Sequence, residues 1–197
     1  MQEEALEKFE VDGLTVKIFR DNDATSPADW SYDGLFLIGN HRDFYVKPPG
    51  VKDRHWDVES VMEQYAKTHR IYPIEAYIHG GVALYLRGKC MIDRQWDVSQ
   101  VGAVFVSKKE WRYEKKAFKA AEALIKEWNQ YLSGDVYNYV IKDEDGDHLD
   151  SCSGFYGEEH VREEATAVAK SLAKDIRTKK QARLKAKIKN KVPLSKR

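Results

Sequence analysis

Two long stretches of the chain carry hydrophobic residues at spacings of three and four, the repeat of one face of an α-helix. The first covers about residues 107–132 and stops before Gly134, which suits the left-handed conformation that follows many helices. The second covers residues 158–176 or more. A shorter helix is predicted over residues 58–69, with Asp57 as its N-cap. The fold must therefore give three helices a surface to pack against.

The other hydrophobic segments are short, rich in β-branched and aromatic residues, and bounded by turn formers, which is typical of strands. Asp145-Gly146 favours a hairpin, and Gly80-Gly81 breaks another strand pair. The predicted strands cover residues 11–20, 34–40, 71–86 in two pieces, 101–106, 136–141 and 149–152. Short connections favour antiparallel pairing. We predict an α+β fold, in which an antiparallel sheet of about five to seven strands packs with three helices. The last helix is expected to be long and basic.

The length of 197 residues suits one domain, and a hydrophobic content of 42% is enough for a core. We expect an α+β body over residues 1–157 and a C-terminal helix with a basic tail over residues 158–197. Two cysteines, without the spacing of a zinc site, favour a reducing cytoplasm and predict neither metal nor cofactor. No long apolar run is present, so we expect a soluble cytoplasmic protein without a membrane partner.

The formal net charge of +1 conceals two regions of opposite sign. Residues 171–197 hold eleven basic residues and one acid, giving +10, whereas residues 1–170 hold 22 basic and 31 acidic residues, giving −9. Basic side chains release counterions when they reach phosphates, so the tail is a candidate nucleic-acid-binding segment. A solvated, frayed helix is the alternative. The candidate residues are Lys179, Lys180, Arg183, Lys185, Lys187 and Lys189.

Cys152 is a candidate nucleophile because it stands in a glycine-rich stretch before a predicted helix, where backbone N–H groups could activate a thiol. A triad would be completed by either His79 or His160 as base and by Asp97 as the residue that orients it. The alternatives are a buried, inert cysteine in a tight turn and, for His79-Gly80-Gly81, a turn or β-bulge. The sequence does not decide whether the chain is an enzyme, and a binding protein is favoured.

Acidic residues gather at Asp21 and Asp23 and again over residues 143–150. A calcium loop of the EF-hand type needs glycine at its sixth position, but Ser26 and His148 stand there. Turn formation by Asp and Asn side chains is the simpler interpretation.

Five motifs occur in an order that resembles a family of small proteins encoded by bacteriophages and mobile elements. They are DNDATSPADW at 21–30, YIHGG at 77–81, QWDVSQVG at 95–102, GDVY at 134–137 and SCSGFYG at 151–157. The resemblance covers roughly residues 15–160 and implies a phage setting without a defined activity. We expect the contact face to include Asp21, Asp23, Trp30, Trp96, Asp97 and Tyr156.

Our leading hypothesis is a non-enzymatic phage accessory protein that binds a host protein complex and inhibits a defence nuclease, of the anti-CRISPR or anti-restriction type. It would act in the cytoplasm of the bacterial host. Mimicry of DNA is disfavoured, because −9 over 170 residues is far below one charge per about 1.7 Å of duplex. A nucleic-acid-binding protein of phage replication or packaging and a cysteine-dependent enzyme are the alternatives.

Overall fold

The computed structural model describes residues 4–30, 33–52, 55–90 and 98–191, with side chains to residue 188. It forms two compact units. Unit 1 joins residues 1–24 to residues 136–197, and unit 2 comprises residues 25–135. This division does not follow the boundary expected at residue 157, because the C-terminal helix packs on a sheet that both ends of the chain build.

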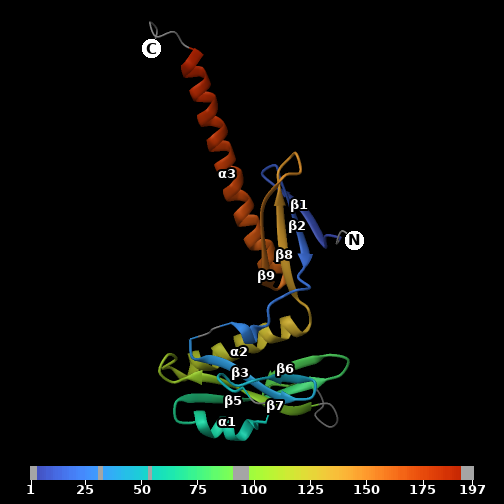
Figure 1. The fold of residues 1–197 in the computed structure, drawn as a ribbon, viewed down its shortest axis with the longest axis vertical. Helices are drawn as coiled ribbons and strands as arrows, with labels where there is room; N and C mark the ends of the chain where they lie inside the picture. Colours follow the sequence, from blue (N-terminus) through green and yellow to red (C-terminus); the bar gives the residue numbers. More distant parts are fainter. Residues whose placement is uncertain (1–3, 31–32, 53–54, 91–97, 192–197) are drawn as a thin grey trace. The chain divides into compact units, whose positions relative to one another are not determined.

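Unit 1 is a four-stranded antiparallel sheet with one long helix, α3 (Glu158–Lys191), along one face (Figure 1). The strand order is β1-β2-β8-β9. The strands are β1 (Glu7–Val11), β2 (Leu14–Arg20), β8 (Val136–Lys142) and β9 (His148–Tyr156). Helix α3 continues past the ends of the strands (Figure 1). Its first part therefore packs on the sheet, and its last part extends beyond the sheet.

The β1–β2 hairpin is one that the sequence signals clearly but that we did not predict. Its loop is Asp12-Gly13, with φ of +53° and +88°, and it joins Val11 directly to Leu14. Positive φ at both positions defines the two-residue turn that suits the twist of paired strands, and Asp-Gly is a preferred dipeptide there. The predicted strand over residues 11–20 is therefore the second strand of this hairpin.

The core of unit 1 lies between β2, β8 and α3. Alternate residues of β2 are buried, while α3 contributes mainly alanines, which let the helix approach the sheet closely. The main buried residues are Leu14, Val16, Ile18, Tyr139, Ile141, Val161, Ala165, Ala169 and Ala173.

Unit 2 is a five-stranded antiparallel sheet covered by α2 on one face and by α1 on the other (Figure 1). The strand order is β4-β3-β7-β5-β6. The elements are η1 (Pro27–Asp29), β3 (Leu35–His41), β4 (Phe44–Val46), α1 (Val58–Tyr65), β5 (His69–Ile78), β6 (Val82–Leu86), β7 (Val98–Ser107) and α2 (Glu114–Leu132). Separate hydrophobic clusters fill the two layers.

The α+β class and the long C-terminal helix are confirmed, but the strands form two sheets rather than one. The predicted start of the second helix near residue 107 is wrong. Strand β7 continues to Ser107, and Arg70 then holds the connecting loop by donating to the carbonyl oxygens of Trp111 and Arg112 at 2.7 and 2.8 Å. Helix α2 therefore begins only at Glu114.

The other predicted helix ends agree better with the structure. Gly134 follows α2 with φ +68°, and the next amide, of Asp135, donates to the carbonyl oxygen of Gln130 at 2.7 Å. Asp57 is the N-cap of α1, where its Oδ1 accepts the Ser60 N–H at 2.8 Å and lowers the pKa of the Asp57 carboxyl. Helix α1 ends before the predicted residue 69, because β5 begins there.

Candidate nucleic-acid interface

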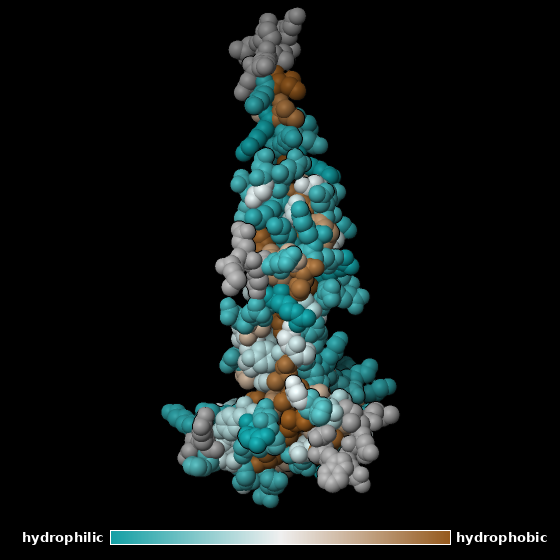
Figure 2. All heavy atoms as spheres, turned by 90° about the vertical axis from the view of Figure 1, so that its right-hand side faces the viewer, coloured by the Kyte–Doolittle hydropathy of each residue, from teal (hydrophilic) through white to brown (hydrophobic). Residues whose placement is uncertain are grey.

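Residues 174–188 of α3 form the cationic helix segment. All fifteen are exposed, and they include seven basic residues and one acid, so their net charge is 7 − 1 = +6. In the space-filling view the projecting helix is mostly hydrophilic, with small hydrophobic areas (Figure 2). The basic residues are Lys174, Arg177, Lys179, Lys180, Arg183, Lys185 and Lys187.

The segment begins where the buried stripe of α3 ends. Ala173 is the last residue of that stripe, at 3% exposed, and Lys174 directly follows it. Arg177 Nη2 pairs with Asp12 Oδ1 of the β1–β2 turn at 3.3 Å and ties the base of the segment to the sheet. No other ion pair of the segment occurs among the described residues. Six of its seven cations are therefore exposed and have no carboxylate partner in the described ranges.

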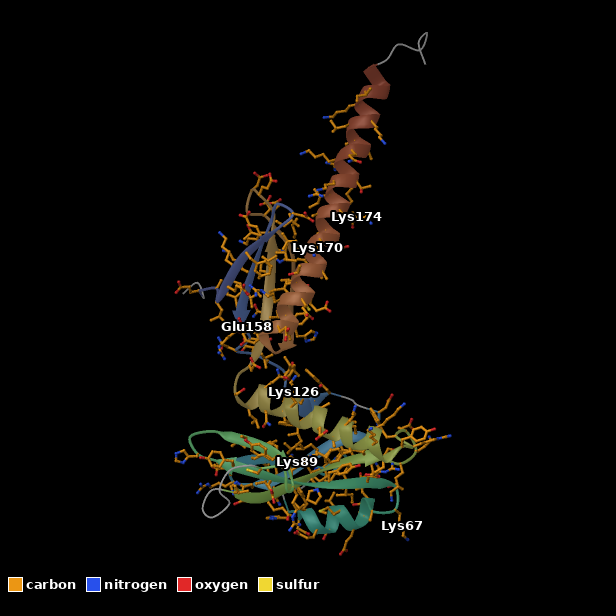
Figure 3. The ribbon with its side chains drawn as sticks, turned by 180° about the vertical axis from the view of Figure 1, so that it is seen from behind. Lys67, Lys89, Lys126, Glu158, Lys170 and Lys174 are labelled. Carbon is orange, nitrogen blue, oxygen red and sulfur yellow. The ribbon has the colours of Figure 1, made fainter. Side chains whose placement is uncertain are left out.

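The charges surround the helix instead of sharing one side. Each residue turns an α-helix by about 100°, so Arg183, Lys185 and Lys187 alternate between opposite sides. In Figure 3, nitrogen-tipped side chains project on both sides of the helix beyond Lys174. The exposed hydrophobic residues Leu184 and Ile188 lie one turn apart, but Lys180 stands between them and Ile176 on the same side, so the segment has no continuous apolar face. This arrangement fits a surrounding polyanion better than a lipid surface, which needs one apolar side.

The residues predicted for a contact face divide between the two units. Asp21 has a structural role, because Oδ2 accepts the Gly154 N–H at 3.0 Å and Oδ1 accepts the Asp23 N–H at 3.2 Å. Tyr156 ends β9, whereas Trp30 follows η1 in unit 2. Trp96 and Asp97 lie outside the described residues. The contact face therefore stays a prediction.

Cys152 lies within β9, opposite Tyr139, and is exposed, so the expectation of a buried cysteine in a tight turn is wrong. The turn expected there is absent because the strand continues to Tyr156. The Cys152 thiol contacts the Ser153 carbonyl oxygen at 3.8 Å. Burial, and then the Asp150 carboxylate, raise the pKa of Tyr139 to about 12, so Tyr139 stays protonated at neutral pH and supplies no base.

The two histidines of unit 1 nearest to Cys152 in sequence have other neighbours. His148 Nε2 lies 3.1 Å from Ser151 Oγ, and the His160 ring packs edge-on against Phe155. His79 belongs to unit 2, in the turn between β5 and β6, where its N–H donates to the Gly81 carbonyl oxygen at 3.1 Å. The turn interpretation of His79-Gly80-Gly81 is thus confirmed, while the triad with Cys152 and Asp97 stays a prediction.

The acidic hairpin loop between β8 and β9 is organised by Asp143. Its Oδ1 accepts the N–H groups of Asp145 and Asp147 at 3.0 and 2.8 Å, which confirms the turn-forming interpretation at this position. Within residues 4–30, 33–52, 55–90 and 98–191, no group of three or more His, Cys, Asp or Glu side chains is arranged to hold a metal ion.

The sequence did not reveal a groove of about 560 Å³ between β6 and α2. Its wall includes Val82, Leu84 and Leu86 from the edge strand and Ile125 from the helix. The Asn129 amide bridges the two walls, because Oδ1 accepts the Leu84 N–H at 2.7 Å and Nδ2 donates to the Leu84 carbonyl oxygen at 2.9 Å. Lys89 and Lys126, labelled in Figure 3, lie at the rim. Only the tertiary pairing of strand and helix creates this groove.

Among the described residues, no helix is both long enough and apolar enough to cross a membrane. Comparison of the chain with protein-family models, with curated proteins and with solved structures finds no match. Proposals of function therefore rest on the chemistry of the chain's own residues.

Proposed function

We propose that the protein binds duplex nucleic acid through the cationic helix segment. The observation that carries the proposal is the run of fifteen exposed helical residues with a net charge of +6. Such a run is roughly 22 Å long at 1.5 Å per residue, which is short enough to follow the groove of a duplex. The segment has no aromatic residue on which single-stranded bases could stack, so a duplex is the better match for it.

Binding to the segment is expected to be independent of sequence. Lysines and arginines that neutralise phosphates release counterions, which supplies affinity without reading bases. The major groove of B-DNA is about 12 Å wide and admits a helix, whereas that of A-form RNA is too narrow. We therefore expect duplex DNA to bind more tightly than duplex RNA.

The test is the salt dependence of binding to a labelled DNA duplex, followed by fluorescence anisotropy. With six phosphates neutralised, the slope of log K against log salt is expected to be about −5, from −0.9 per phosphate. A variant with five segment cations changed to Gln should lose most of this slope. The changes are Lys179→Gln, Lys180→Gln, Arg183→Gln, Lys185→Gln and Lys187→Gln.

The matched control removes five exposed lysines of unit 2 and so makes the same change of net charge. It carries Lys52→Gln, Lys67→Gln, Lys115→Gln, Lys119→Gln and Lys126→Gln. The control should keep nearly the full slope, because non-contacting charges act only through screened, longer-range fields. Equal slopes in the two variants would overturn the proposal. Tight binding to anionic vesicles but not to duplexes would favour a membrane surface instead.

A second candidate function is the inhibition of a host defence nuclease by protein contact. The observation that favours a protein contact is the groove beside edge strand β6, whose wall is largely apolar. Affinity capture from phage-infected cells, with and without nuclease treatment, tests it. A protein partner that survives nuclease treatment supports inhibition, whereas recovery of nucleic acid alone supports the first proposal.

A further inference from the structure

The unit 1 sheet has two faces of different character. Leu14, Val16 and Ile18 of β2 point into the cluster beneath α3, so Thr15, Lys17 and Phe19 point to the other face. On β8 the same alternation places Asn138, Val140 and Lys142 there. We call this second surface the open face, because α3, the one helix of unit 1 in the described part of the chain, lies on the opposite side.

Strand register arranges the open face as a regular block. Thr15 is paired with Lys142, Lys17 with Val140 and Phe19 with Asn138 across β2 and β8. On the outer strands, Lys8 of β1 is opposite Lys17, and Ser151 of β9 is opposite Val140. All of these positions are exposed or half-buried. Three lysines, hydroxyl groups and one aromatic ring therefore share a surface.

The lysines of this face lack ion-pair partners in the part of the chain that the structure describes. Within the described residues, Lys8, Lys17 and Lys142 form no ion pair, and Glu10 is the acid that β1 adds to the face. Lys8 and Lys17 are directly opposite, a placement that destabilises a sheet because like charges repel. This like-charged pair, between edge strand β1 and β2, is relieved of repulsion when an anionic ligand supplies the missing counter-charge.

We propose that the open face binds a nucleic-acid single strand, with its phosphates at Lys8, Lys17 and Lys142 and a base stacked on Phe19. The face is poorly suited to a duplex groove, since four strands spaced by about 4.8 Å span roughly 14 Å and the major groove is about 12 Å wide. An aromatic ring beside cations is the usual means of holding an unpaired base and its backbone. This inference rests on nucleic-acid binding as the proposed function and adds a second, separate site to it.

The test compares labelled oligo(dT) and oligo(rU) of 20 nucleotides with a DNA duplex, using the full-length chain. Phe19→Leu keeps an apolar side chain but removes the stacking ring, and it should weaken single-strand binding roughly tenfold. The double variant Lys17→Gln and Lys142→Gln should reduce the magnitude of the salt slope for single strands by about 1.4, from about −0.7 per phosphate for two phosphates. Both variants should leave the duplex affinity of the cationic helix segment unchanged.

A second readout separates binding from simple damage to the fold. Lys17→Gln removes the like-charge contact with Lys8, so it should raise or preserve the urea midpoint while it weakens single-strand binding. Control changes Lys67→Gln and Lys119→Gln, both exposed in unit 2, should alter neither the midpoint nor the slope by a comparable amount.

The outcomes distinguish the two proposed sites. If the variant with five neutral residues in α3 loses duplex binding but keeps Phe19-dependent single-strand binding, both sites stand. Single-strand binding that is unaffected by Phe19→Leu and by the double lysine variant overturns the open-face proposal, whatever the duplex result. Loss of duplex affinity in Phe19→Leu to the same degree would also count against it, because one shared site would explain both.

Discussion

Replacing Gly102 by alanine tests whether the close approach of the β3 backbone to Gly102 of β7 is required. Gly102 of β7 pairs with Gly39 of β3, and a Cβ at Gly102 would overlap the Ile38 carbonyl oxygen and lie 2.9 Å from its carbonyl carbon. A sheet carbonyl cannot rotate away without losing its hydrogen bonds, so the strands would have to separate. We expect Gly102→Ala to destabilise unit 2 severely.

The magnitude follows from two contributions. Overpacking of this kind costs about 1–3 kcal/mol, and weakening one or two ladder hydrogen bonds adds about 1 kcal/mol each. The total of about 2–5 kcal/mol is a large fraction of the 5–15 kcal/mol that typically stabilises a domain. Gly81→Ala is the matched control, because a Cβ at Gly81 would meet no atom within 4 Å. Its free energy of unfolding should stay within about 1 kcal/mol of the wild type.

Urea unfolding followed by tryptophan fluorescence provides the assay. All five tryptophans belong to residues 25–135, so the signal reports on unit 2. The midpoint of Gly102→Ala should fall sharply while that of Gly81→Ala stays near the wild type. If both variants unfold at the wild-type midpoint, or if they lose equal stability, the strand approach at Gly102 is not the constraint that the structure indicates.

Three further predictions concern single side chains. Asn129→Ala should lower the free energy of unfolding of unit 2 by about 1–3 kcal/mol, because the Leu84 N–H and carbonyl oxygen lose their partner. Asn129→Asp should cost at least as much, because it places a second acceptor against the Leu84 carbonyl oxygen. A urea midpoint of Asn129→Asp equal to that of the wild type would refute this. Burial, and then Lys108, lower the pKa of His69 below its usual 6.5, so the neutral ring stabilises the fold above that pH. This contribution should be lost as the pH falls from 6.5 towards the folded pKa, and the urea midpoint should drop less in His69→Gln than in the wild type between pH 7.5 and 5.5. A thiol reagent should label exposed Cys152 in the native protein and buried Cys90 only after unfolding, and Cys152→Ala should keep full duplex binding; labelling of Cys90 first would contradict the structure.

Local chemistry accounts for the parts of the structure that were predicted well. Asp57 caps α1 and Gly134 ends the turn after α2, because the bonds that each makes involve residues only a few positions away. The Asp12-Gly13 hairpin could have been found by the same reasoning. The cationic helix segment belongs to this class too, since its charge and its helical propensity are properties of fifteen successive residues.

Other features depend on partners far away in the chain. Local alternation gave β2 two faces, but only its pairing with β8 and the packing of α3 determined which face is buried. Cys152 is exposed because β9 is an edge strand, and α2 starts late because Arg70, more than forty residues earlier, binds its preceding loop.

The sequence by itself thus determined the class of fold, the helix caps and the basic projection, which are set by short-range periodicity, hydrogen bonding and charge. The tertiary structure alone decided the division into two sheets, the groove beside β6 and the block of lysines on the open face. The physical reason is that periodicity shows that a face exists, whereas strand order and register, which are set by burial between distant segments, determine what that face meets.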